Sequence, residues 1–296
     1  MTGKEIWVFG DFRNYFQNRV TLQILARAAE LAEPLRQTVC AVVLGRQTDE
    51  YTAEYIAHGA QKVYVIDDPA LENYSVESYS WLIARLAAEY RPETLLVGAT
   101  RFGQEMAPRI AKRLRTGLTA DCIDLKTDKK GRLVQIAPSF GGNLIASILT
   151  PKQRPQMATV RPGIFQERPH DYDATGEIIS LPLPHDLPAP RIRMVKSEKM
   201  PDVKQAIEDA DIVICGGRGM GSKKKFQKLY DLAELMNAEV GATRPIVYSQ
   251  WAPHDALVGQ AGKSIRPRVL FSFGISGAIQ HTAAITRADF IISINK

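Results

Sequence analysis

Residues 38–67 have the sequence TVCAVVLGRQTDEYTAEYIAHGAQKVYVID, and this stretch decides the fold class. Its two ends, 38–45 and 62–67, are short apolar runs rich in valine, which is typical of buried strands. The segment between them, around 49–57, predicts a helix. A strand, a helix and a second strand in this order form the crossover unit of a parallel sheet, so the stretch predicts an α/β fold.

The same alternation continues on both sides of this stretch. Near-continuous apolar strands indicate a sheet that helices cover on both faces, because a parallel sheet buries both of its surfaces. Further strands are predicted at 5–12 and 94–100, and helices at 21–35, 76–90 and 103–115. Ser75 is the expected N-cap of the helix at 76–90, since its hydroxyl can accept a hydrogen bond from the first turn.

Beyond Asp121 the chain changes to short strands that are separated by glycine, proline and lysine turns. These strands are predicted at 122–127, 132–138, 143–149 and 156–162. The later segment 168–190 contains Pro169, Pro182, Pro184, Pro188 and Pro190. It has no helical periodicity, so we expect it to be a linker.

A second alternation of strands and helices follows the proline-rich segment. Its strands are predicted at 211–217, 238–243, 268–274 and 289–295, and Phe226, Leu229, Tyr230 and Ala233 form the apolar face of a helix. We therefore expect two domains. The first, at 1–190, is an α/β domain with a parallel sheet and added short strands, and the second, at 191–296, is a flavodoxin- or Rossmann-like α/β domain.

The composition excludes several classes of protein. With 45% hydrophobic and 24% charged residues over 296 positions, the chain matches a globular protein, and its length suggests two units of ~150 residues. No apolar run reaches the ~18–20 residues needed to span a bilayer, and no signal-peptide pattern opens the chain, so we expect a cytoplasmic protein without membrane insertion.

The cysteines and the net charge further limit which chemistry and which binding partners the sequence suits. Cys40, Cys122 and Cys215 are far apart in apolar segments, which favours buried reduced thiols over a disulfide, metal or catalytic role. The formal charge of +6 is scattered except at 223–225, and no nucleic-acid motif accompanies it. The positive charge therefore suits an anionic cofactor or an acidic partner protein better than nucleic acid.

Three segments of the second domain combine a strand end with glycines. They are GGRGMGSKKK (216–225), EVGATRPIVYSQWAPHDALVGQAGKSIRP (239–267) and FGISGAIQHTAAI (273–285). Such turns can bind an anion through backbone amides and a following helix N-terminus. The first fits neither a P-loop nor the dinucleotide-binding pattern, because Ser222 precedes Lys223 and occupies the place of the third glycine. A tight turn with solvated lysines is the alternative.

Polar side chains in the other two segments could face a ligand. Arg244 precedes a proline and lies near Trp251, an arrangement that suits stacking on a planar ring or pairing with phosphate. Ser276 and Gln280 would share one face of a helix that opens at 276–277, with His281 beside them. A single helical histidine is more often a surface or satisfied core residue. Because ligands of open parallel sheets bind at the carboxyl ends of strands, the three segments together favour a binding site.

Six motifs give the chain a close resemblance to the α subunit of electron transfer flavoproteins. They are TGLTADCIDL (116–125), SFGGNLIASILTPKQRPQMATVRPG (139–163), GGRGMGS (216–222), VGATRP (240–245), VGQAGKSIRP (258–267) and GISGAIQHTAAI (274–285). The resemblance implies a heterodimer with a β subunit, in which the C-terminal domain of the α subunit carries FAD. The N-terminal domain would contribute to the body that the two subunits share.

The resemblance also assigns residues to the cofactor. It implies that Arg244 lies over the isoalloxazine with Gln260 beside it, that Ser276, Gln280 and His281 line the ribityl and pyrimidine side, and that Asn295 reaches toward the adenosine. An imidazole donor and a guanidinium would stabilise negative charge on the reduced ring. The expected cofactor-binding residues are Arg218, Arg244, Gln260, Ala261, Gly262, Ser276, Gly277, Ala278, Gln280, His281 and Asn295.

The chain departs from the family pattern in two places. Ala261 occupies a position at which the family commonly has a hydroxyl residue near flavin N5, so that hydrogen bond is expected to be missing. The family also continues beyond the strand that ends at Asn295 and Lys296, with an aspartate-containing segment that helps to hold the adenosine. We therefore expect either a truncated chain or a site completed in another way.

The resemblance implies an electron carrier between flavoprotein dehydrogenases of the acyl-CoA dehydrogenase type, as in fatty acid β-oxidation, and a downstream acceptor. One alternative is an electron-bifurcating form that uses NADH and a second FAD in the β subunit. Another is a non-redox module that binds nucleotide for assembly. The weakest option is a substrate-transforming enzyme, because the sequence shows no paired carboxylates, nucleophile–base pair or metal cluster.

Overall fold

The computed structural model describes residues 5–139, 144–192, 194–196, 207–285 and 288–296. Contacts within the chain divide it into two compact units, Met1–Ser197 and Glu198–Lys296. Each unit is built around its own parallel sheet, so the predicted α/β class with two such sheets is confirmed.

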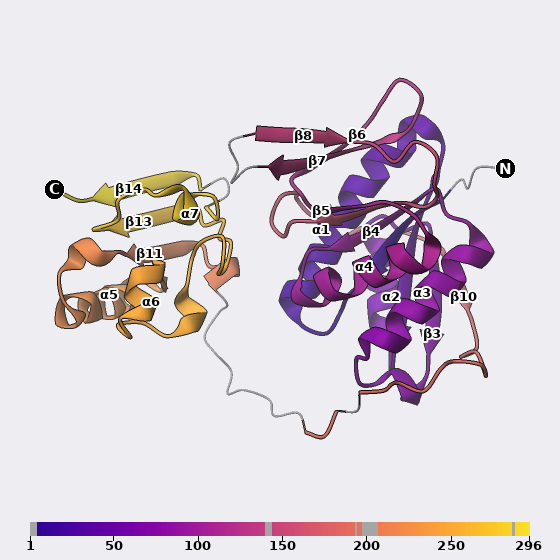
Figure 1. The fold of residues 1–296 in the computed structure, drawn as a ribbon, viewed down its shortest axis with the longest axis horizontal. Helices are drawn as coiled ribbons and strands as arrows, with labels where there is room; N and C mark the ends of the chain where they lie inside the picture. Colours follow the sequence, from indigo (N-terminus) through magenta and orange to yellow (C-terminus); the bar gives the residue numbers. More distant parts are fainter. Residues whose placement is uncertain (1–4, 140–143, 193, 197–206, 286–287) are drawn as a thin grey trace. The chain divides into compact units, whose positions relative to one another are not determined.

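A seven-stranded sheet forms the centre of the first unit (Figure 1). All of its neighbouring strands pair in parallel. In spatial order the strands are β10 (Glu177–Ser180), β3 (Lys62–Asp67), β2 (Thr38–Gly45), β1 (Glu5–Gly10), β4 (Thr94–Gly98), β9 (Gln156–Val160) and β5 (Leu118–Cys122). Because the chain runs from β1 to β3 in one direction and then returns to β4 on the other side, the strand order reverses between β1 and β4.

Helices cover both faces of this sheet, as predicted. Helices α1 (Tyr15–Ala32) and α2 (Asp49–Ala57) supply residues to one core, and α3 (Val76–Tyr90) and α4 (Arg101–Leu114) supply residues to the other. Successive residues of β1 point alternately into the two cores: Val8 belongs to the first, and Trp7 and Phe9 belong to the second.

Helix α1 begins six residues before the predicted start at Thr21. Asn14 is its N-cap, with a side chain that accepts a hydrogen bond from the Gln17 amide at 2.9 Å. Gln17, Asn18 and Thr21 are buried polar residues. They interrupt the apolar periodicity of the first turns, which is why the sequence pattern placed the helix start too late.

The proline-rich stretch 168–190, which we expected to be a linker, contains strand β10. This strand pairs with β3 at the edge of the main sheet, with Ile178 opposite Val63. Leu181, Leu183 and Leu187 then pack against the core that α3 and α4 share. Pro182 comes one residue after Leu181, whose amide makes the last bond to β3, so its missing amide donor leaves no partner unsatisfied at this sheet edge.

A small antiparallel sheet also belongs to the first unit. It consists of β6 (Asp124–Thr127), β7 (Leu133–Ser139) and β8 (Leu144–Ile148), in that spatial order. Strand β8 lies at the edge and exposes Leu144, Ile145 and Ile148 to solvent.

Arg13 lies at the carboxyl edge of the main sheet, in the loop after β1, where it lines a cavity of about 120 Å³. Its Nε and Nη2 donate to the two carboxylate oxygens of Asp11, each at 2.7 Å. The guanidinium carbon lies 4.1 Å from the ring centroid of Tyr74 and 3.9 Å from that of Phe102. Arg13 therefore connects the loop after β1 to the residues that begin α3 and α4.

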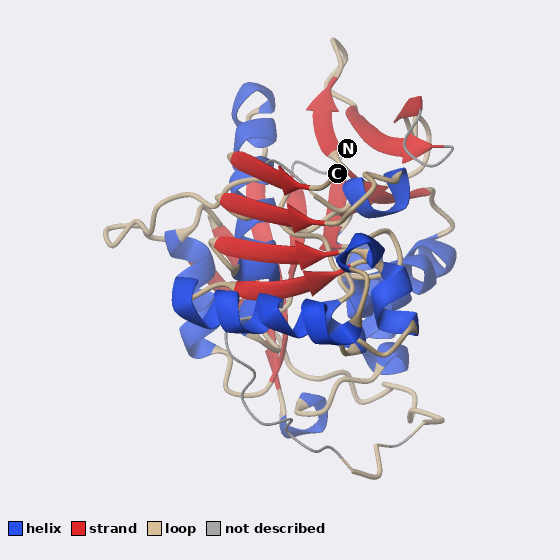
Figure 2. Ribbon diagram, turned by 90° about the vertical axis from the view of Figure 1, so that its left-hand side faces the viewer, coloured by secondary structure: helices blue, strands red, loops and turns tan. Residues whose placement is uncertain are grey.

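The second unit contains a four-stranded parallel sheet, which Figure 2 shows as four arrows that point the same way. In spatial order the strands are β12 (Glu239–Ala242), β11 (Ile212–Gly216), β13 (Val269–Phe273) and β14 (Phe290–Ile294). Helix α5 (Lys223–Met236) packs Phe226, Leu229 and Ala233 into one core, which Ile214 of β11 also enters. Two short helices, α6 (Arg244–Tyr248) and α7 (Ile279–Thr282), complete the unit.

The three cysteines are buried and free, as predicted. Burial raises the pKa of the Cys122 and Cys215 thiols to about 12, so both are protonated at neutral pH and poor nucleophiles. No group of His, Cys, Asp and Glu within the described ranges could hold a metal ion. Among the same residues, no helix has both the length and the apolar content to cross a bilayer.

Gly103 provides a test of how α4 packs on β4. A Cβ atom built on Gly103 would lie 1.8 Å from the Gly98 carbonyl oxygen, which is backbone and cannot rotate away. We expect Gly103→Ala to lower the free energy of unfolding by about 1–3 kcal/mol, as overpacking does. Urea unfolding of the full chain measures this loss. The exposed Glu105→Ala in the same helix is the control and should change stability by less than about 0.5 kcal/mol; equal losses would contradict the packing argument.

Candidate functional site

The carboxyl ends of all four strands meet at one edge of the second sheet. The chain passes from β11 to β12 on one side and then to β13 on the other side of β11. The strand order therefore reverses between β11 and β13. Ligands of open α/β sheets bind at such a switch point, outside the carboxyl ends of the strands.

Glycines allow the loops after β11 and β13 to touch at this point. Gly217 donates its amide to the Phe273 carbonyl at 2.8 Å, and Gly219 donates to the Gly274 carbonyl at 2.9 Å. A Cβ atom on Gly219 would lie 2.7 Å from the Gly274 Cα. Gly274 also has a φ of 61°, which favours glycine. Side chains at these positions would force the two loops apart.

A cavity of about 440 Å³ opens at this edge. This volume lies within the range of small-molecule sites, roughly 300–1,000 Å³. Its lining comes from the segments that follow each of the four strands. The expected residues that line it are Arg218, Arg244, Gln260, Ala261, Ser276, Ala278, Gln280, His281 and Asn295. Gly262 and Gly277 are not among the described lining residues.

The charge in the cavity is positive. Arg218 lies in a short 3₁₀ turn, Arg218–Met220, after β11, and Arg244 begins α6 directly after β12. Both are exposed, and no ion pair within the described part of the chain involves either of them. No aspartate or glutamate is among the described residues of the lining. Two guanidinium groups that have no carboxylate partner among the described residues favour an anionic ligand.

His281 is the buried ionisable residue of the cavity, with 6% of its surface exposed. Its Nδ1 forms a 2.9 Å hydrogen bond with the Val258 carbonyl oxygen, and its Nε2 is buried without a partner within the described residues. Burial lowers the pKa of His281, and the bond to Val258 partly offsets this by raising it. A buried ring nitrogen without a partner is costly, so the site suits a ligand that supplies one.

The loop 257–263 is hydrogen-bonded to α7 through its backbone. The Gln260 amide donates to the Gln280 carbonyl at 2.8 Å, and the Gly262 amide donates to the Gly259 carbonyl at 2.9 Å. A Cβ atom on Gly262 would lie 2.2 Å from the Leu257 carbonyl oxygen. Gly262 therefore shapes the loop that carries Gln260 and Ala261, although it does not line the cavity itself.

Our expectation that a helix opens at Ser276–Gly277 was wrong. Gly277 has a φ of 74° and Ala278, with a ψ of 139°, is not helical, so α7 begins only at Ile279. Ser276 and Gln280 do not share a helical face, because Ser276 precedes the helix. They still both line the cavity, because Gly277 turns the chain between them.

Asn295 connects the end of β14 to the loop after β13. Its Nδ2 donates to the Ile275 carbonyl at 3.0 Å, and the Gly274 amide donates to the Ile294 carbonyl at 2.9 Å. Sequence reasoning did not single out Val258, Thr243 or Ile275, which also line the cavity. The Val258 carbonyl oxygen accepts a hydrogen bond from His281. Because every residue has a backbone carbonyl, the residue type at position 258 does not reveal this role in the sequence.

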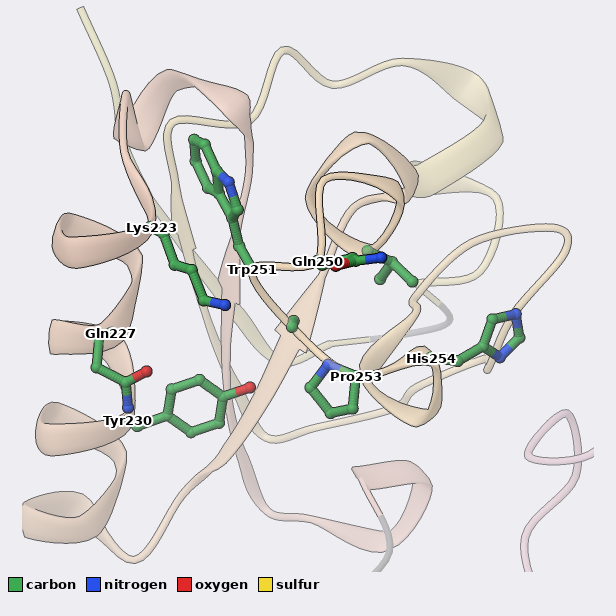
Figure 3. Close-up of a pocket in the computed structure, with 9 residues that line it drawn as sticks. Lys223, Gln227, Tyr230, Gln250, Trp251, Pro253 and His254 are labelled. Atoms are coloured by element: carbon green, nitrogen blue, oxygen red, sulfur yellow. The ribbon is translucent and has the colours of Figure 1, made fainter.

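A second hollow lies beside α5 and is lined by Lys223, Gln227, Tyr230, Val247 and residues 250–254. Figure 3 shows that Trp251 and His254 point away from each other, so these two rings do not face a common ligand position. Trp251 lines this hollow and is not among the residues of the cavity that contains Arg244. The cavity at the strand ends is therefore the better candidate.

Gly274 and Gly221 both have a positive φ, but only Gly274 contacts another loop. Comparing alanine substitutions at the two positions therefore distinguishes the cost of losing the loop contact from the cost of backbone strain. Gly274 has backbone atoms of Gly219 and Met220 at 2.7 Å from a built Cβ, whereas Gly221, with a φ of 78°, has nothing within 4 Å. An alanine with such a positive φ lowers the free energy of unfolding by about 1–2 kcal/mol at either position. We expect Gly274→Ala to destabilise the second unit by about 1–3 kcal/mol more than Gly221→Ala.

Hydrogen exchange of the β11 and β13 amides in the full chain measures the stability of the second unit. Equal protection losses in the two variants would mean that the loops can separate without cost, and would contradict the close contact at Gly219 and Gly274.

Comparisons with known proteins agree with this geometry. The family model described as "Electron transfer flavoprotein domain" matches residues 6–186, and that described as "Electron transfer flavoprotein FAD-binding domain" matches residues 206–286. The chain is 42% identical over 293 residues to the electron transfer flavoprotein subunit alpha of Thermoanaerobacterium thermosaccharolyticum, covering 99% of this chain and 89% of the relative.

Two further relatives extend the comparison. The subunit alpha of Clostridium acetobutylicum is 41% identical over 297 residues, covering 99% of this chain and 88% of the relative. The protein FixB of Azorhizobium caulinodans is 38% identical over 298 residues, covering 99% of this chain and 80% of the relative. The chain therefore belongs to the electron transfer flavoprotein α-subunit family, and its second unit, which carries the cavity at the strand ends, is the FAD-binding domain of that family.

Proposed function

We propose that this chain is the α subunit of a heterodimeric electron transfer flavoprotein, and that the cavity at the carboxyl edge of the second sheet holds its FAD. The observation that carries the proposal is the donor set of the cavity. Among the described residues, its two arginines form no ion pair, its lining has no carboxylate, and Nε2 of the buried His281 has no partner. FAD supplies the electron-accepting ring when it is bound, and the chain supplies binding, orientation and electrostatics.

The residues at the site fit the chemistry of this group. FAD carries a diphosphate, and the loops after β11 and β12 offer Arg218 and Arg244 as cations and donors. Its isoalloxazine is planar and polar at one edge, which suits a guanidinium on its face and a ring nitrogen at its edge. We assign the binding role to the full expected set, with Gly262 and Gly277 as residues that shape the loops.

Ala261 limits the hydrogen bonds that the loop can donate to the bound isoalloxazine. Its methyl group cannot form a hydrogen bond, so no side chain at this position of the loop can donate to the isoalloxazine. The remaining donors to the ring are then backbone amides, Gln260 and the charged side chains of the lining. The reduced ring would therefore depend more strongly on electrostatic stabilisation by Arg244 and His281.

The partner that we propose is the β subunit, and the electron donor a flavoprotein dehydrogenase of the acyl-CoA dehydrogenase type. Two relatives are named as alpha subunits, which supports an assembly with a second chain. Leu144 and Ile145 expose 57% and 67% of their surfaces on an edge strand, as is common where another protein docks. The buried free cysteines suit a reducing compartment such as the cytoplasm.

Co-expression with the β subunit of the same source tests the proposal. We expect a yellow complex with the absorption spectrum of FAD and one FAD per heterodimer. A colourless complex that cannot take up FAD would contradict it, and a complex that binds adenine nucleotide without flavin would identify a non-redox module. Two flavins per heterodimer together with oxidation of NADH would identify the electron-bifurcating form.

Arg244→Ala tests the binding role of the positive charge. A hydrogen bond to a charged group contributes about 1.5–3 kcal/mol, so we expect the FAD dissociation constant to rise by about ten- to a hundredfold. Fluorescence titration of the deflavinated complex measures the change. Lys224→Ala removes an exposed positive charge outside the cavity lining and should leave the affinity within about twofold. Equal effects of the two substitutions would mean that only the net charge matters.

A further inference from the structure

An ion pair lies at the base of the loop 257–263, which lines the cavity with its tip. The Lys263 amide closes the loop by donating to the Leu257 carbonyl at 2.7 Å. Gln260 and Ala261 at the tip line the cavity, whereas Lys263 is not among the described lining residues. An effect of the Lys263 side chain on a ligand would therefore pass through the loop that it closes.

The partner of Lys263 is Glu208, in the 3₁₀ turn Ile207–Asp209 that precedes β11. Lys263 Nζ lies 3.0 Å from Glu208 Oε2, and the two side chains expose 31% and 15% of their surfaces. Glu208 Oε2 is buried, and no hydrogen-bond donor within the described residues reaches it. The ammonium group of Lys263 therefore balances the charge of a carboxylate that is otherwise poorly compensated.

Apolar contacts join the same two segments. Ile207 from the turn and Val258 from the loop are both buried and belong to one core cluster. A Cβ atom built on Gly241 in β12 would lie 3.0 Å from a methyl group of Val258 and 3.2 Å from one of Ile207. The turn and the base of the loop therefore pack together against β12, and the ion pair between Glu208 and Lys263 connects them.

The tip of the loop depends on its base for its position. Gln260, Ala261 and Gly262 are exposed, so apolar burial does not hold them in place. The base is buried at Val258 and ion-paired at Lys263. Residues of a binding site need such support, because small displacements of a group that contacts the ligand already weaken its effect.

We propose that the ion pair between Glu208 and Lys263 positions the loop 257–263 for the bound FAD, which makes both of them positioning residues of the cofactor site. The inference rests on the proposed function. A direct Coulomb effect of Glu208 has the opposite sign: its carboxylate repels an anionic ligand, so its removal would tighten binding if charge alone mattered. If the pair holds the loop, removal of the same carboxylate weakens binding.

The experiment measures the FAD dissociation constant of the deflavinated complex with its β subunit by fluorescence titration. We expect Glu208→Gln to raise this constant by about fivefold or more, because the neutral amide no longer holds the Lys263 ammonium. The matched control, Glu234→Gln, removes one exposed negative charge of α5 outside the cavity lining and should stay within about twofold. A Glu208→Gln complex that binds FAD as tightly as the wild type, or more tightly, overturns the inference.

Lys263→Gln tests the other half of the pair. It leaves the buried Glu208 carboxylate without its cation, so we expect a larger loss of FAD affinity than in Glu208→Gln. The double variant contains neither charge, and its affinity should return to that of Glu208→Gln. A double variant that binds FAD as weakly as Lys263→Gln would mean that Lys263 acts on the cofactor directly, and this result overturns the inference.

Two further measurements distinguish positioning of the loop from a general loss of stability. Visible circular dichroism of the bound FAD reports the surroundings of its ring and should change in Glu208→Gln but not in Glu234→Gln. Hydrogen exchange should show a loss of protection at the Gln260 and Gly262 amides, which bond to the Gln280 and Gly259 carbonyls at 2.8 and 2.9 Å. Equal losses in this loop and in β11 and β13 would indicate a purely structural ion pair and overturn the inference.

The outcomes separate this inference from the proposed function. A wild-type complex that cannot take up FAD overturns the proposed function, and the inference with it. A wild-type complex that contains FAD, together with a Glu208→Gln complex of unchanged affinity, overturns the inference alone. If Lys263→Gln does not fold, the affinity and hydrogen exchange of Glu208→Gln decide the question.

Discussion

All four strands of the second sheet run in the same direction, and the site depends on this one constraint. Parallel strands begin at one edge and end at the other, so the segments after β11, β12, β13 and β14 emerge together. The segments after the neighbouring strands β11 and β12 therefore lie side by side at the edge that also contains the reversal between β11 and β13. Arg218 and Arg244, more than twenty residues apart in sequence, line one cavity for this reason.

Glycine determines how closely these loops can approach. At Gly219 and Gly274 the two backbones are in direct contact, and at Gly262 the chain passes over the Leu257 carbonyl. Backbone contacts between glycines thus determine the shape of the site, and the side chains that line it extend from these loops. His281 illustrates the result, since a backbone carbonyl sets which of its nitrogens faces the ligand. The same bond fixes the ring and limits what it can offer to a cofactor.

The alternation of strands and helices could be predicted from the sequence because each element carries its own periodicity. The helix at 76–90 is predicted to the residue, since Ser75 caps it and its apolar stripe is regular. The start of α1 is hidden by buried polar residues, and the start of α7 by the conformation of Gly277. Strand β10 lies among prolines, and its pairing with β3 is a long-range contact that no local pattern contains. The candidate site residues came from the motifs that resemble a family. The Val258 carbonyl that binds His281 Nδ1 could be found only in the structure. The role of the site residues toward FAD stays a prediction.

Arg13 has a consequence for the first unit. Its sheet has the same kind of reversal point as the second sheet, and there the Arg13 guanidinium packs against Tyr74 and Phe102 and pairs with Asp11, beside a cavity of only about 120 Å³. A tethered guanidinium acts at an effective concentration far above that of any free metabolite, so an external ligand would compete against an intramolecular one. The edge of the first sheet therefore holds an intramolecular cation and little free volume, whereas the edge of the second sheet holds a cavity of about 440 Å³. One chain thus contains two parallel sheets with the same kind of reversal point and very different free volume beside it.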